Sequence, residues 1–436
     1  MRTANAISLI ATLVSAGACG SVSGIPDASE TAEPIDAPGT APTPDAASTA
    51  RIRVRVGNIP ADLAASQYFA YLRFGDGPWA AAPRSTADPS LYEFEAPIGR
   101  YTFAVGCARA PGSTLRNVAV FELLTSDIQE WGYLAPCTPG NPGTLAGTLA
   151  SIGAERFMVS LRQDISIVTP AQMYSVAVEP GTYDVVASMI NLPLVAVRTS
   201  VIRDVQLGAN ANVPLNIAIT PLQATVQRTV ALVGGAGSVS SLFVTNNGTA
   251  ALLSGDASEP YNVTTLAPAQ VLPSDRHLYI ASATVENDVL VTTQAVSGAD
   301  AMTTVQLPPR LVGANAQFAT DSSATYPNVV ATWPQALTPT AYQLEASNRG
   351  AGTSPGWQVL ISAGAMGESR TARLPDFSGI PGFPSEFALA AGATISTEVA
   401  ALSSNMGMAD LLSLHRNLPR GTTTTRSSTR FSVAVP

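Results

Sequence analysis

The sequence predicts an all-β protein built from tandem β-sandwich domains. From residue 51 onward, short runs of Val, Ile, Thr, Tyr and Phe are separated by Gly, Pro, Asn and Asp, which is typical of strands and turns. The first run, Arg51–Val56, alternates strictly between arginine and an aliphatic residue, as a strand with one solvent-facing side does. A group of aromatic, glycine and aliphatic residues also recurs after 82 residues, which indicates repeated modules.

The length and composition indicate a folded chain of several domains. The 436 residues are enough for several units of about 100–200 residues each. Charged residues make up only 12% of the chain and hydrophobic residues 46%, which excludes a solvated disordered protein. The formal net charge of −8 argues against a nucleic-acid partner.

The N-terminus predicts export. Arg2 precedes an apolar run, residues 6–14, and small residues follow, which is the three-part pattern of a secretory signal peptide. The small residues 16–18 lead directly into Cys19. This segment resembles the lipobox of bacterial lipoproteins, although that family prefers Leu where Ala16 stands. The resemblance implies that residues 1–18 are a signal peptide and that Cys19 carries a lipid anchor, which would make a membrane the partner of the chain.

Two other interpretations of this segment stay open. An ordinary signal peptidase that cleaves after Ala18 would release the chain without a lipid, and a cytosolic protein can carry an apolar N-terminus. Gly20 resembles the residue that follows the cysteine in lipoproteins sorted to the outer membrane. We therefore expect a cell-envelope location, facing the periplasm or the surface.

Residues 19–50 form the expected linker between the anchor and the body. Beyond the cysteine this stretch contains five prolines and five acidic residues but no aromatic or basic residue. It has no core to bury, so we expect an extended stalk.

The cysteine count predicts one disulfide in the body. If Cys19 is lipidated, Cys107 and Cys137 remain as a pair in an exported chain. A bridge between them would constrain the unfolded chain by about 3–4 kcal/mol. Two buried free thiols are the alternative.

We divide the body into four predicted β-sandwich domains, at residues 51–140, 141–221, 222–310 and 311–436. The three arginines of the first strand share one side, and we expect a solvated face that resists edge-to-edge pairing. The remaining predicted strands of the first three units are Tyr68–Phe74, Leu91–Glu95, Tyr101–Cys107, Asn117–Leu124, Arg156–Arg162, Val195–Val205, Val213–Ile219, Thr225–Val233, Ser241–Thr245, His277–Val285 and Val289–Gln294.

The repeat has the form strand, Pro-Gly turn, strand, and we interpret it as a hairpin. Its members are Tyr92, Phe94, Gly99, Tyr101 and Phe103 in the first copy, and Tyr174, Val176, Gly181, Tyr183 and Val185 in the second. A weaker third copy runs from Tyr261 to residues 278–281, with a longer connection. The second copy, residues 176–187, resembles the hairpin of carboxypeptidase regulatory-like, transthyretin-like domains. That resemblance implies small Ig-like β-sandwiches that carry no catalysis themselves.

The last unit has a different signature. Trp333 closes one predicted strand, residues 329–334, and Tyr342 opens the next, residues 342–346. This pattern is similar to fibronectin type III modules, and the similarity implies that both rings lie between the sheets. Residues 408–418 form the best helix candidate, ending at Pro419.

Few residues carry reactive chemistry. His277 and His415 are the two histidines, and neither has a carboxylate or cysteine at metal-ligand spacing, so we expect no metal site and place His277 on the surface. Asp184 and Asp204 are candidates for calcium, but no run of alternating Asp or Asn supports an ion loop. No Gly-x-Ser-x-Gly motif indicates a serine hydrolase. We expect no catalytic residues and no cofactor.

The functional hypothesis is a non-catalytic cell-envelope lipoprotein whose modules serve binding, structural or adhesive roles, with envelope proteins or glycans as possible partners. The alternative is an array of carbohydrate-binding modules, which exposed Trp79, Trp131 and Trp357 on one face would favour. An envelope hydrolase is a third hypothesis, and it requires a pocket with converging Asp, Glu or Ser groups.

Overall fold

The computed structural model describes residues 48–434, except for short gaps at 60–63, 65–66, 110–112, 138–139, 150–155, 163, 169–172, 192–194, 218–222, 298–301, 312–315, 322–325, 327, 334–337, 349–354, 393 and 414–417. The predicted signal peptide, Cys19, most of the predicted linker and His415 therefore lie outside the described residues. Among the helices of the described part, none is long and apolar enough to span a membrane.

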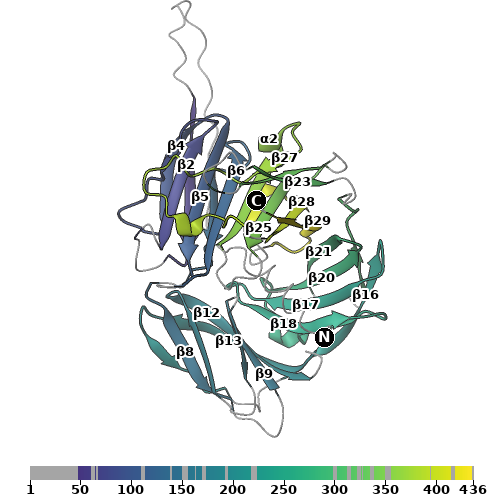
Figure 1. Ribbon diagram of the computed structural model, residues 1–436. Coiled ribbons are helices and arrows are strands. Elements are labelled where there is room, and N and C mark those ends of the chain that lie inside the picture. Colours follow the sequence, from purple (N-terminus) through teal and green to yellow (C-terminus); the bar gives the residue numbers. More distant parts are fainter. Residues whose placement is uncertain are drawn as a thin grey trace, which may run out of the picture.

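The all-β prediction is confirmed: the described chain folds into β-sandwiches with only a few short helical turns (Figure 1). The first sandwich packs a sheet in the order β4-β1-β7 against strands β3-β2-β5-β6, and β1 runs parallel to β7. Ile52, Val54 and Val56 of β1 are fully buried between these sheets. The strands are β1 (Thr49–Gly57), β2 (Tyr68–Phe74), β3 (Ala80–Ala81), β4 (Leu91–Pro97), β5 (Arg100–Ala108), β6 (Arg116–Leu124) and β7 (Glu130–Leu134).

The second sandwich repeats this topology strand for strand. Its first strand again pairs antiparallel with the fourth and parallel with the seventh, giving the sheet β11-β8-β14. The other sheet contains β10, β9, β12 and β13. The strands are β8 (Gly143–Thr148), β9 (Arg156–Leu161), β10 (Asp164–Val168), β11 (Met173–Val178), β12 (Gly181–Asn191), β13 (Val195–Leu207) and β14 (Asn212–Pro214).

The third sandwich has the same arrangement, with the sheet β19-β16-β22 opposite β18, β17, β20 and β21. A two-residue strand β15 precedes it and pairs with β13 of the second sandwich. The elements are β15 (Gln223–Ala224), β16 (Val226–Val233), β17 (Ser238–Val244), β18 (Ala250–Ala257), β19 (Asn262–Thr265), η1 (Pro268–Gln270), β20 (Arg276–Val285), β21 (Asp288–Val296) and β22 (Met302–Gln306).

The hairpin interpretation of the repeat is wrong. Strands β4 and β5 belong to opposite sheets, because β4 pairs with β1 whereas β5 pairs with β2 and β6. The repeated spacing therefore marks a connection that crosses from one sheet to the other. Its aromatic rings meet across the core, with centroids 5.4 Å apart for Tyr92 and Phe103 and 6.1 Å apart for Phe94 and Tyr101. Period-two alternation predicted the buried faces correctly but does not specify which strand is the hydrogen-bonding partner.

The fourth sandwich is built differently, with the sheet β23-β24-β27 opposite β26-β25-β28-β29. Trp333 and Tyr342 are both buried in its core, with ring centroids 5.1 Å apart. The predicted helix begins at Met408, but its described part ends at Ser413. The elements are β23 (Gln317–Asp321), β24 (Asn328–Thr332), β25 (Ala341–Asn348), β26 (Pro355–Ser362), α2 (Ala363–Met366), β27 (Thr371–Arg373), η3 (Ser385–Phe387), β28 (Thr394–Ser404), α3 (Met408–Ser413) and β29 (Thr423–Ala434).

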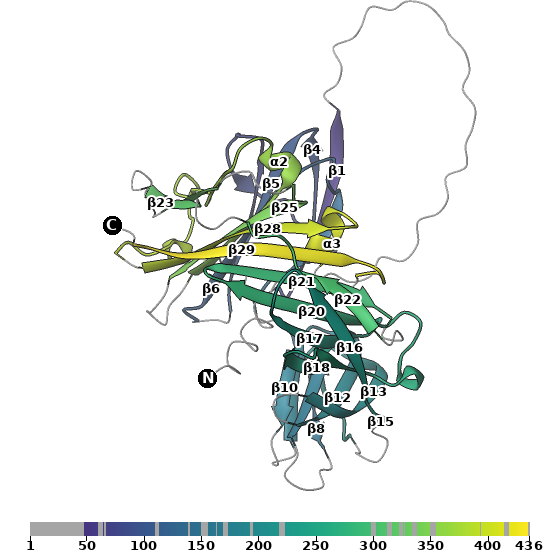
Figure 2. The ribbon, with the colours of Figure 1, turned by 90° about the vertical axis from the view of Figure 1, so that its right-hand side faces the viewer.

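The four sandwiches are joined through one continuous run of paired strands. The edge strand β6 of the first sandwich pairs in parallel with β26 of the fourth, over Arg116–Glu122 and Pro355–Ile361. On the other edge of the fourth sandwich, β29 pairs antiparallel with β21 of the third, over seven residue pairs. Strand β18 of the third then meets β13 of the second at Ser254 and Val195. Figure 2 shows β28, β29, β21 and β20 side by side along this run.

The spatial order of the sandwiches therefore differs from their order along the chain. The first sandwich, coloured purple in Figure 1, lies beside the green and yellow fourth one. The second and third sandwiches share an apolar core, in which Met158, Val186 and Ile190 of the second pack with Leu242 and Ile280 of the third. The sandwiches therefore pair and pack against one another and are not independent domains in a row.

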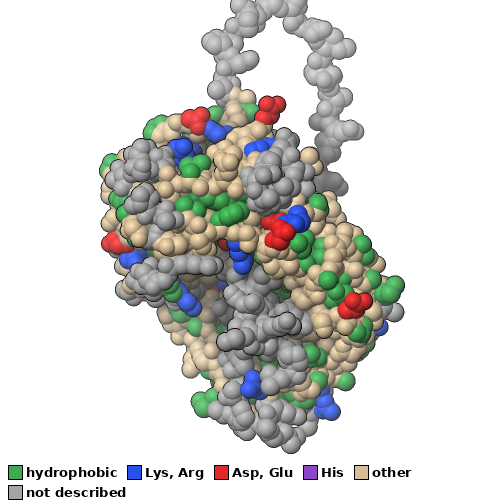
Figure 3. Space-filling view, turned by 45° about the vertical axis from the view of Figure 1, so that its right-hand side comes forward, with side chains coloured by type: hydrophobic (Ala, Val, Ile, Leu, Met, Phe, Trp, Pro, Cys, Tyr) green, Lys and Arg blue, Asp and Glu red, His purple; other side chains and the backbone are tan. Residues whose placement is uncertain are grey.

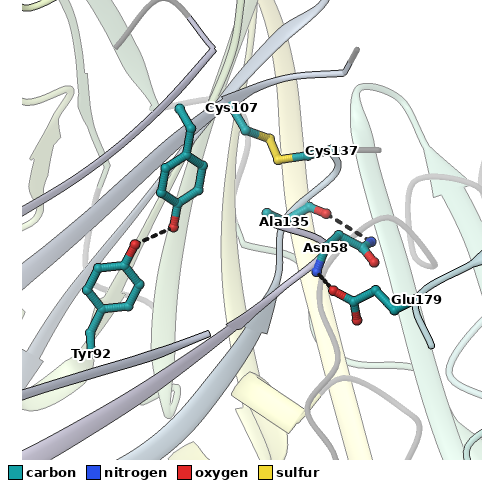
Figure 4. The surroundings of a disulfide bond; sticks show 7 residues. Asn58, Tyr92, Cys107, Ala135, Cys137 and Glu179 are labelled. Carbon is teal, nitrogen blue, oxygen red and sulfur yellow. Dashed lines mark hydrogen bonds between the residues drawn. A yellow bond between two sulfur atoms is a disulfide. The ribbon is translucent and has the colours of Figure 1, made fainter. Parts of the chain in front are cut away.

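The first sandwich contains a disulfide between Cys107 and Cys137, whose Cα atoms are 5.9 Å apart (Figure 4). Cys107 lies near the end of β5, and Cys137 follows β7 in the opposite sheet. A hydrogen bond of 2.7 Å between the hydroxyls of Tyr68 and Tyr92 also connects the two sheets. The bridge thus crosses the core of the sandwich.

Candidate functional site

The candidate site is a cavity of about 270 Å³ where the first, third and fourth sandwiches meet. Its walls come from β6 and β7 of the first sandwich, β21 of the third, and β25, β26, β28, β29 and α3 of the fourth. Small-molecule sites occur preferentially at such domain junctions, and this cavity is just below the usual size range for a drug-sized ligand.

The polar floor of the cavity comes from the outward face of the fourth sandwich. Along β25, Tyr342 and Leu344 point into the sandwich core, so Gln343 and Glu345 point to the other side. Glu398 on β28 lies directly opposite Glu345 in the strand register, and Arg430 on β29 lies opposite Glu398. In an isolated sandwich this face would meet water. Here the neighbouring sandwiches cover it.

Arg426 balances the two facing carboxylates. Its Nη2 donates to Glu398 Oε1 at 2.7 Å and to Glu345 Oε1 at 3.2 Å, while Nη1 donates to Gln343 Oε1. Gln343 Nε2 donates to Glu345 Oε1 at 2.8 Å, and Arg430 Nε donates to Glu398 Oε2. Like charges directly opposite on adjacent strands repel each other, so the shared guanidinium stabilises this register.

The two carboxylates experience different balances of burial and charge. Burial alone raises the pKa of Glu398, but the guanidiniums of Arg426 and Arg430 outweigh it and hold that pKa at about 2. For Glu345, burial is the larger effect and its pKa is raised, although Arg426 opposes the rise. The side chain of Glu345 retains 29% of its accessible surface, whereas that of Glu398 retains 8%. Because Glu345 lines the cavity, this remaining surface is available to a ligand there.

Part of the cavity wall is apolar. Phe121 and Tyr133 of the first sandwich and Leu411 of α3 contribute to it, together with Leu360 and Leu402, which lie on the same face of the fourth sandwich as Gln343 and Glu345. Helix α3 positions part of this wall, because its residues Met408 and Leu412 pack into the core of the first sandwich. The predicted terminal helix therefore acts as a connector between two sandwiches.

The surface placement of His277 is wrong. His277 lies on β20, is 1% exposed, and accepts a hydrogen bond at Nε2 from the backbone N–H of Leu266 at 3.1 Å. Burial lowers its pKa to about 4. The ring is therefore neutral at pH 7, and its hydrogen bond connects β20 to the residue that follows β19.

This depressed pKa predicts a loss of stability in mild acid. In the unfolded chain His277 has its ordinary pKa of 6.5, so below pH 6.5 the unfolded state binds the extra proton and the native state does not. The free energy of unfolding should fall by about 2.5 kcal/mol between pH 7 and pH 4.5 through this group alone. Urea unfolding of His277→Gln, whose amide oxygen can still accept from Leu266, should lack this contribution. Parallel pH profiles of the two proteins would contradict the assignment.

The candidate calcium residues Asp184 and Asp204 do lie together, but protein donors occupy them. Asn247 Nδ2 donates to Oδ1 of both, at 3.0 and 3.1 Å, and Arg203 Nη1 donates to Asp184 Oδ2 at 2.8 Å. Within the described part of the chain, no group of three or more His, Cys, Asp or Glu is arranged to hold a metal ion. The two aspartates instead fasten the second sandwich to the third.

The three tryptophans do not form an exposed sugar-binding face. Trp131 and Trp357 are each 6% exposed, and Trp79 is half-buried. Trp131 lies in the core of the first sandwich, and Trp357 donates from Nε1 to the carbonyl of Phe387 at 2.8 Å in the fourth. The condition set for the carbohydrate-binding alternative is therefore not met.

Sequence reasoning missed the residues that form the cavity floor. Glu345, Glu398 and Arg426 look like the wet face of a strand, and alternation alone cannot distinguish solvent from a covering domain. The one available signal was the presence of charged residues on three strands of one module in a chain with few charges.

Comparisons with known proteins give only distant likenesses. No known protein family matches the chain, and no curated protein matches it in sequence. Among solved structures, the Bacillus anthracis TIE protein aligns over 82% of this chain and 69% of its own, with 9% identity and a TM-score of 0.15. The FN1–FN3 domains of chicken CNTN1 align over 85% and 89%, with 9% identity and a TM-score of 0.17. A DUF3823 family protein from Bacteroides ovatus aligns over 68% and 100%, with 11% identity and a TM-score of 0.13. At these TM-scores nothing carries over to this chain.

Proposed function

We propose that this chain is a non-catalytic, exported cell-envelope lipoprotein that presents its four sandwiches as a single binding platform. The observation that carries the proposal is the continuous strand pairing from the first sandwich through the fourth to the third and second. Backbone hydrogen bonds at these seams oppose relative motion, which suits a surface that must keep its shape. We also infer transthyretin-like modules for the first three units and a fibronectin type III-like module for the fourth, in keeping with their different strand orders.

The proposed location rests on the N-terminal segment and is supported by the cysteines. A lipidated Cys19 at the start of an acidic, proline-rich stalk would hold the platform away from the membrane. A disulfide such as Cys107–Cys137 persists in an oxidising compartment. We propose envelope proteins or other envelope components as partners, and not nucleic acid. On the face shown in Figure 3, the charged side chains are scattered without a large area of one sign, whereas nucleic-acid binding relies on a continuous basic surface.

We propose a non-catalytic role because His277 and the cavity carboxylates are poorly placed for catalysis. The buried ring of His277 already accepts a backbone N–H and has a pKa of about 4, which makes it a poor general base. In the cavity, Glu345 and Glu398 share one guanidinium instead of facing each other across an open space for substrate. This arrangement suits recognition better than hydrolysis.

Substitution of the anchor residue tests the proposed location. The full chain expressed in a bacterium that processes lipoproteins should enter the detergent phase in a Triton X-114 partition, and Cys19→Ser should move it to the aqueous phase because a single thiol carries the lipid. Ser21→Ala, two residues further along, serves as the control and should partition like the wild type. A Cys19→Ser protein that still enters the detergent phase would refute lipidation.

A further inference from the structure

The cavity between the first, third and fourth sandwiches contains two polar groups that the protein itself leaves unsatisfied. Oε1 of Glu345 accepts from Gln343 and Arg426, but Oε2 has no partner among the described residues. Tyr133 is 5% exposed and lines the same cavity, and its hydroxyl also has no hydrogen-bond partner in the described part of the chain. Because Glu345 and Tyr133 both line the cavity, each offers a polar group to a molecule bound there.

The charges of the cavity favour a cation over an anion. Three carboxylates (Glu345, Glu398 and Asp410) and two guanidiniums (Arg426 and Arg430) line it, which gives a formal charge of −1. Both terminal nitrogens of Arg426 already donate to protein acceptors, and Arg430 donates to Glu398. An anionic ligand would find Arg426 engaged and would face three carboxylates, whereas a cation would find the accessible oxygen of Glu345.

The rest of the wall indicates that the ligand has an apolar body. Phe121 and Tyr133 bring two aromatic side chains to the cavity, and Leu360 and Leu402 add aliphatic surface. Aromatic faces attract organic cations as well as apolar groups. A cavity of about 270 Å³ limits the ligand to a small molecule.

We propose that this cavity binds a small organic cation, an amine attached to an aromatic or aliphatic body, with Glu345 pairing the ammonium group and Tyr133 donating or accepting a further hydrogen bond. The inference deepens the proposed binding function, since it names the class of ligand for one site on the platform. The proposed cation site does not depend on the lipid anchor or the stalk.

Three matched probes test the charge preference on the purified full chain. Isothermal titration at pH 7.5 should show binding of 2-phenylethylamine, much weaker binding of the neutral 2-phenylethanol, and no binding of the anionic 3-phenylpropionate. Equal affinity for the amine and the alcohol would overturn the proposal, as would no binding of the amine. Preferential binding of the carboxylate would assign the site to an anion at Arg430 instead.

Two variants test the residues. Glu345→Gln keeps the length of the side chain and an oxygen that can accept from Gln343 and Arg426, and it should weaken 2-phenylethylamine binding about thirtyfold or more by removing the charge. Tyr133→Phe keeps the ring in the core and should weaken binding several-fold. Glu130→Gln, an exposed substitution on the same strand as Tyr133, is the matched control and should bind like the wild type. Undiminished binding by a folded Glu345→Gln protein would overturn the assignment.

The Triton X-114 partition of the same preparation keeps the two proposals separate. A chain that enters the detergent phase but binds none of the probes would retain its proposed location and lose only the cation site.

Discussion

Replacing Arg203 by methionine is expected to destabilise the protein by about 4–5 kcal/mol. Arg203 lies on β13 of the second sandwich and joins two carboxylates from different units. Its Nη1 donates to Asp184 Oδ2 at 2.8 Å, and its Nη2 donates to Asp275 Oδ2 of the third sandwich at 2.5 Å. The carboxylate side chains are 1% and 0% exposed, so removing the guanidinium leaves two buried negative charges without their cation.

The pH dependence of this effect provides its check. Burial opposes ionisation of Asp184, but hydrogen bonds from the Asp204 backbone and from Arg203 outweigh it and lower the pKa below 3.8. This contribution to stability is present above pH 3.8 and is lost as the pH falls through the lowered pKa of the folded state. In urea unfolding, the difference between wild type and Arg203→Met should therefore shrink toward pH 3.

A matched surface substitution completes this experiment. Arg51→Met removes an arginine that is 65% exposed and pairs with Glu93, and it should change the free energy of unfolding by no more than about 0.5 kcal/mol. If Arg203→Met lowered the free energy of unfolding no more than Arg51→Met does, the ion pairs of Arg203 with Asp184 and Asp275 would not hold the second and third sandwiches together.

Replacing Ile280 by aspartate is expected to have an effect of about 5 kcal/mol and to open the molecule. Ile280 lies on β20 but points away from the core of its own sandwich, in which the neighbouring residues Tyr279 and Ala281 are buried. Its side chain packs in the shared core with Val186 and Ile190 of the second sandwich. A carboxylate at this position would be buried without a partner unless the two sandwiches separate.

Small-angle X-ray scattering and urea unfolding together detect this change. Ile280→Asp should increase the radius of gyration and lower the unfolding midpoint, while the third sandwich keeps its own core. Val285→Asp on the same strand is the control, because Val285 is 38% exposed and the charge can remain in water. An unchanged scattering profile for Ile280→Asp, with stability like that of the control, would show that the shared core does not join the sandwiches.

The strands were predicted well because their signal is local. Tyr68–Phe74 matches β2, and most of the other predicted runs differ from the observed strands by a few residues at their ends. Arg51, Arg53 and Arg55 share one side of β1 as expected, yet β1 lies in the middle of its sheet and does not form an edge. Alternation reports which side chains are buried, but every strand offers the same backbone donors and acceptors to any neighbour.

The candidate site was not predictable for the same reason. Glu345 and Arg426 lie on a face that would be solvated in an isolated sandwich. The first and third sandwiches cover that face, and they are positioned there by the pairings β6–β26 and β29–β21. His277 was misplaced because a lone histidine beside Asp275 and Arg276 looks like a surface turn. In the structure its ring accepts a hydrogen bond from Leu266, which follows β19. The residues beside His277 in the sequence do not indicate this partner.

The sequence by itself determined the all-β class, the repeated modules and the buried side of each strand, because these follow from side-chain periodicity along the chain. Only the tertiary structure decided that the repeat crosses between sheets, that the first sandwich adjoins the fourth, and that a charged face lines a cavity. These features depend on backbone hydrogen bonds and packing between segments far apart in the chain. Such contacts produce no periodic pattern in the sequence of the residues that make them.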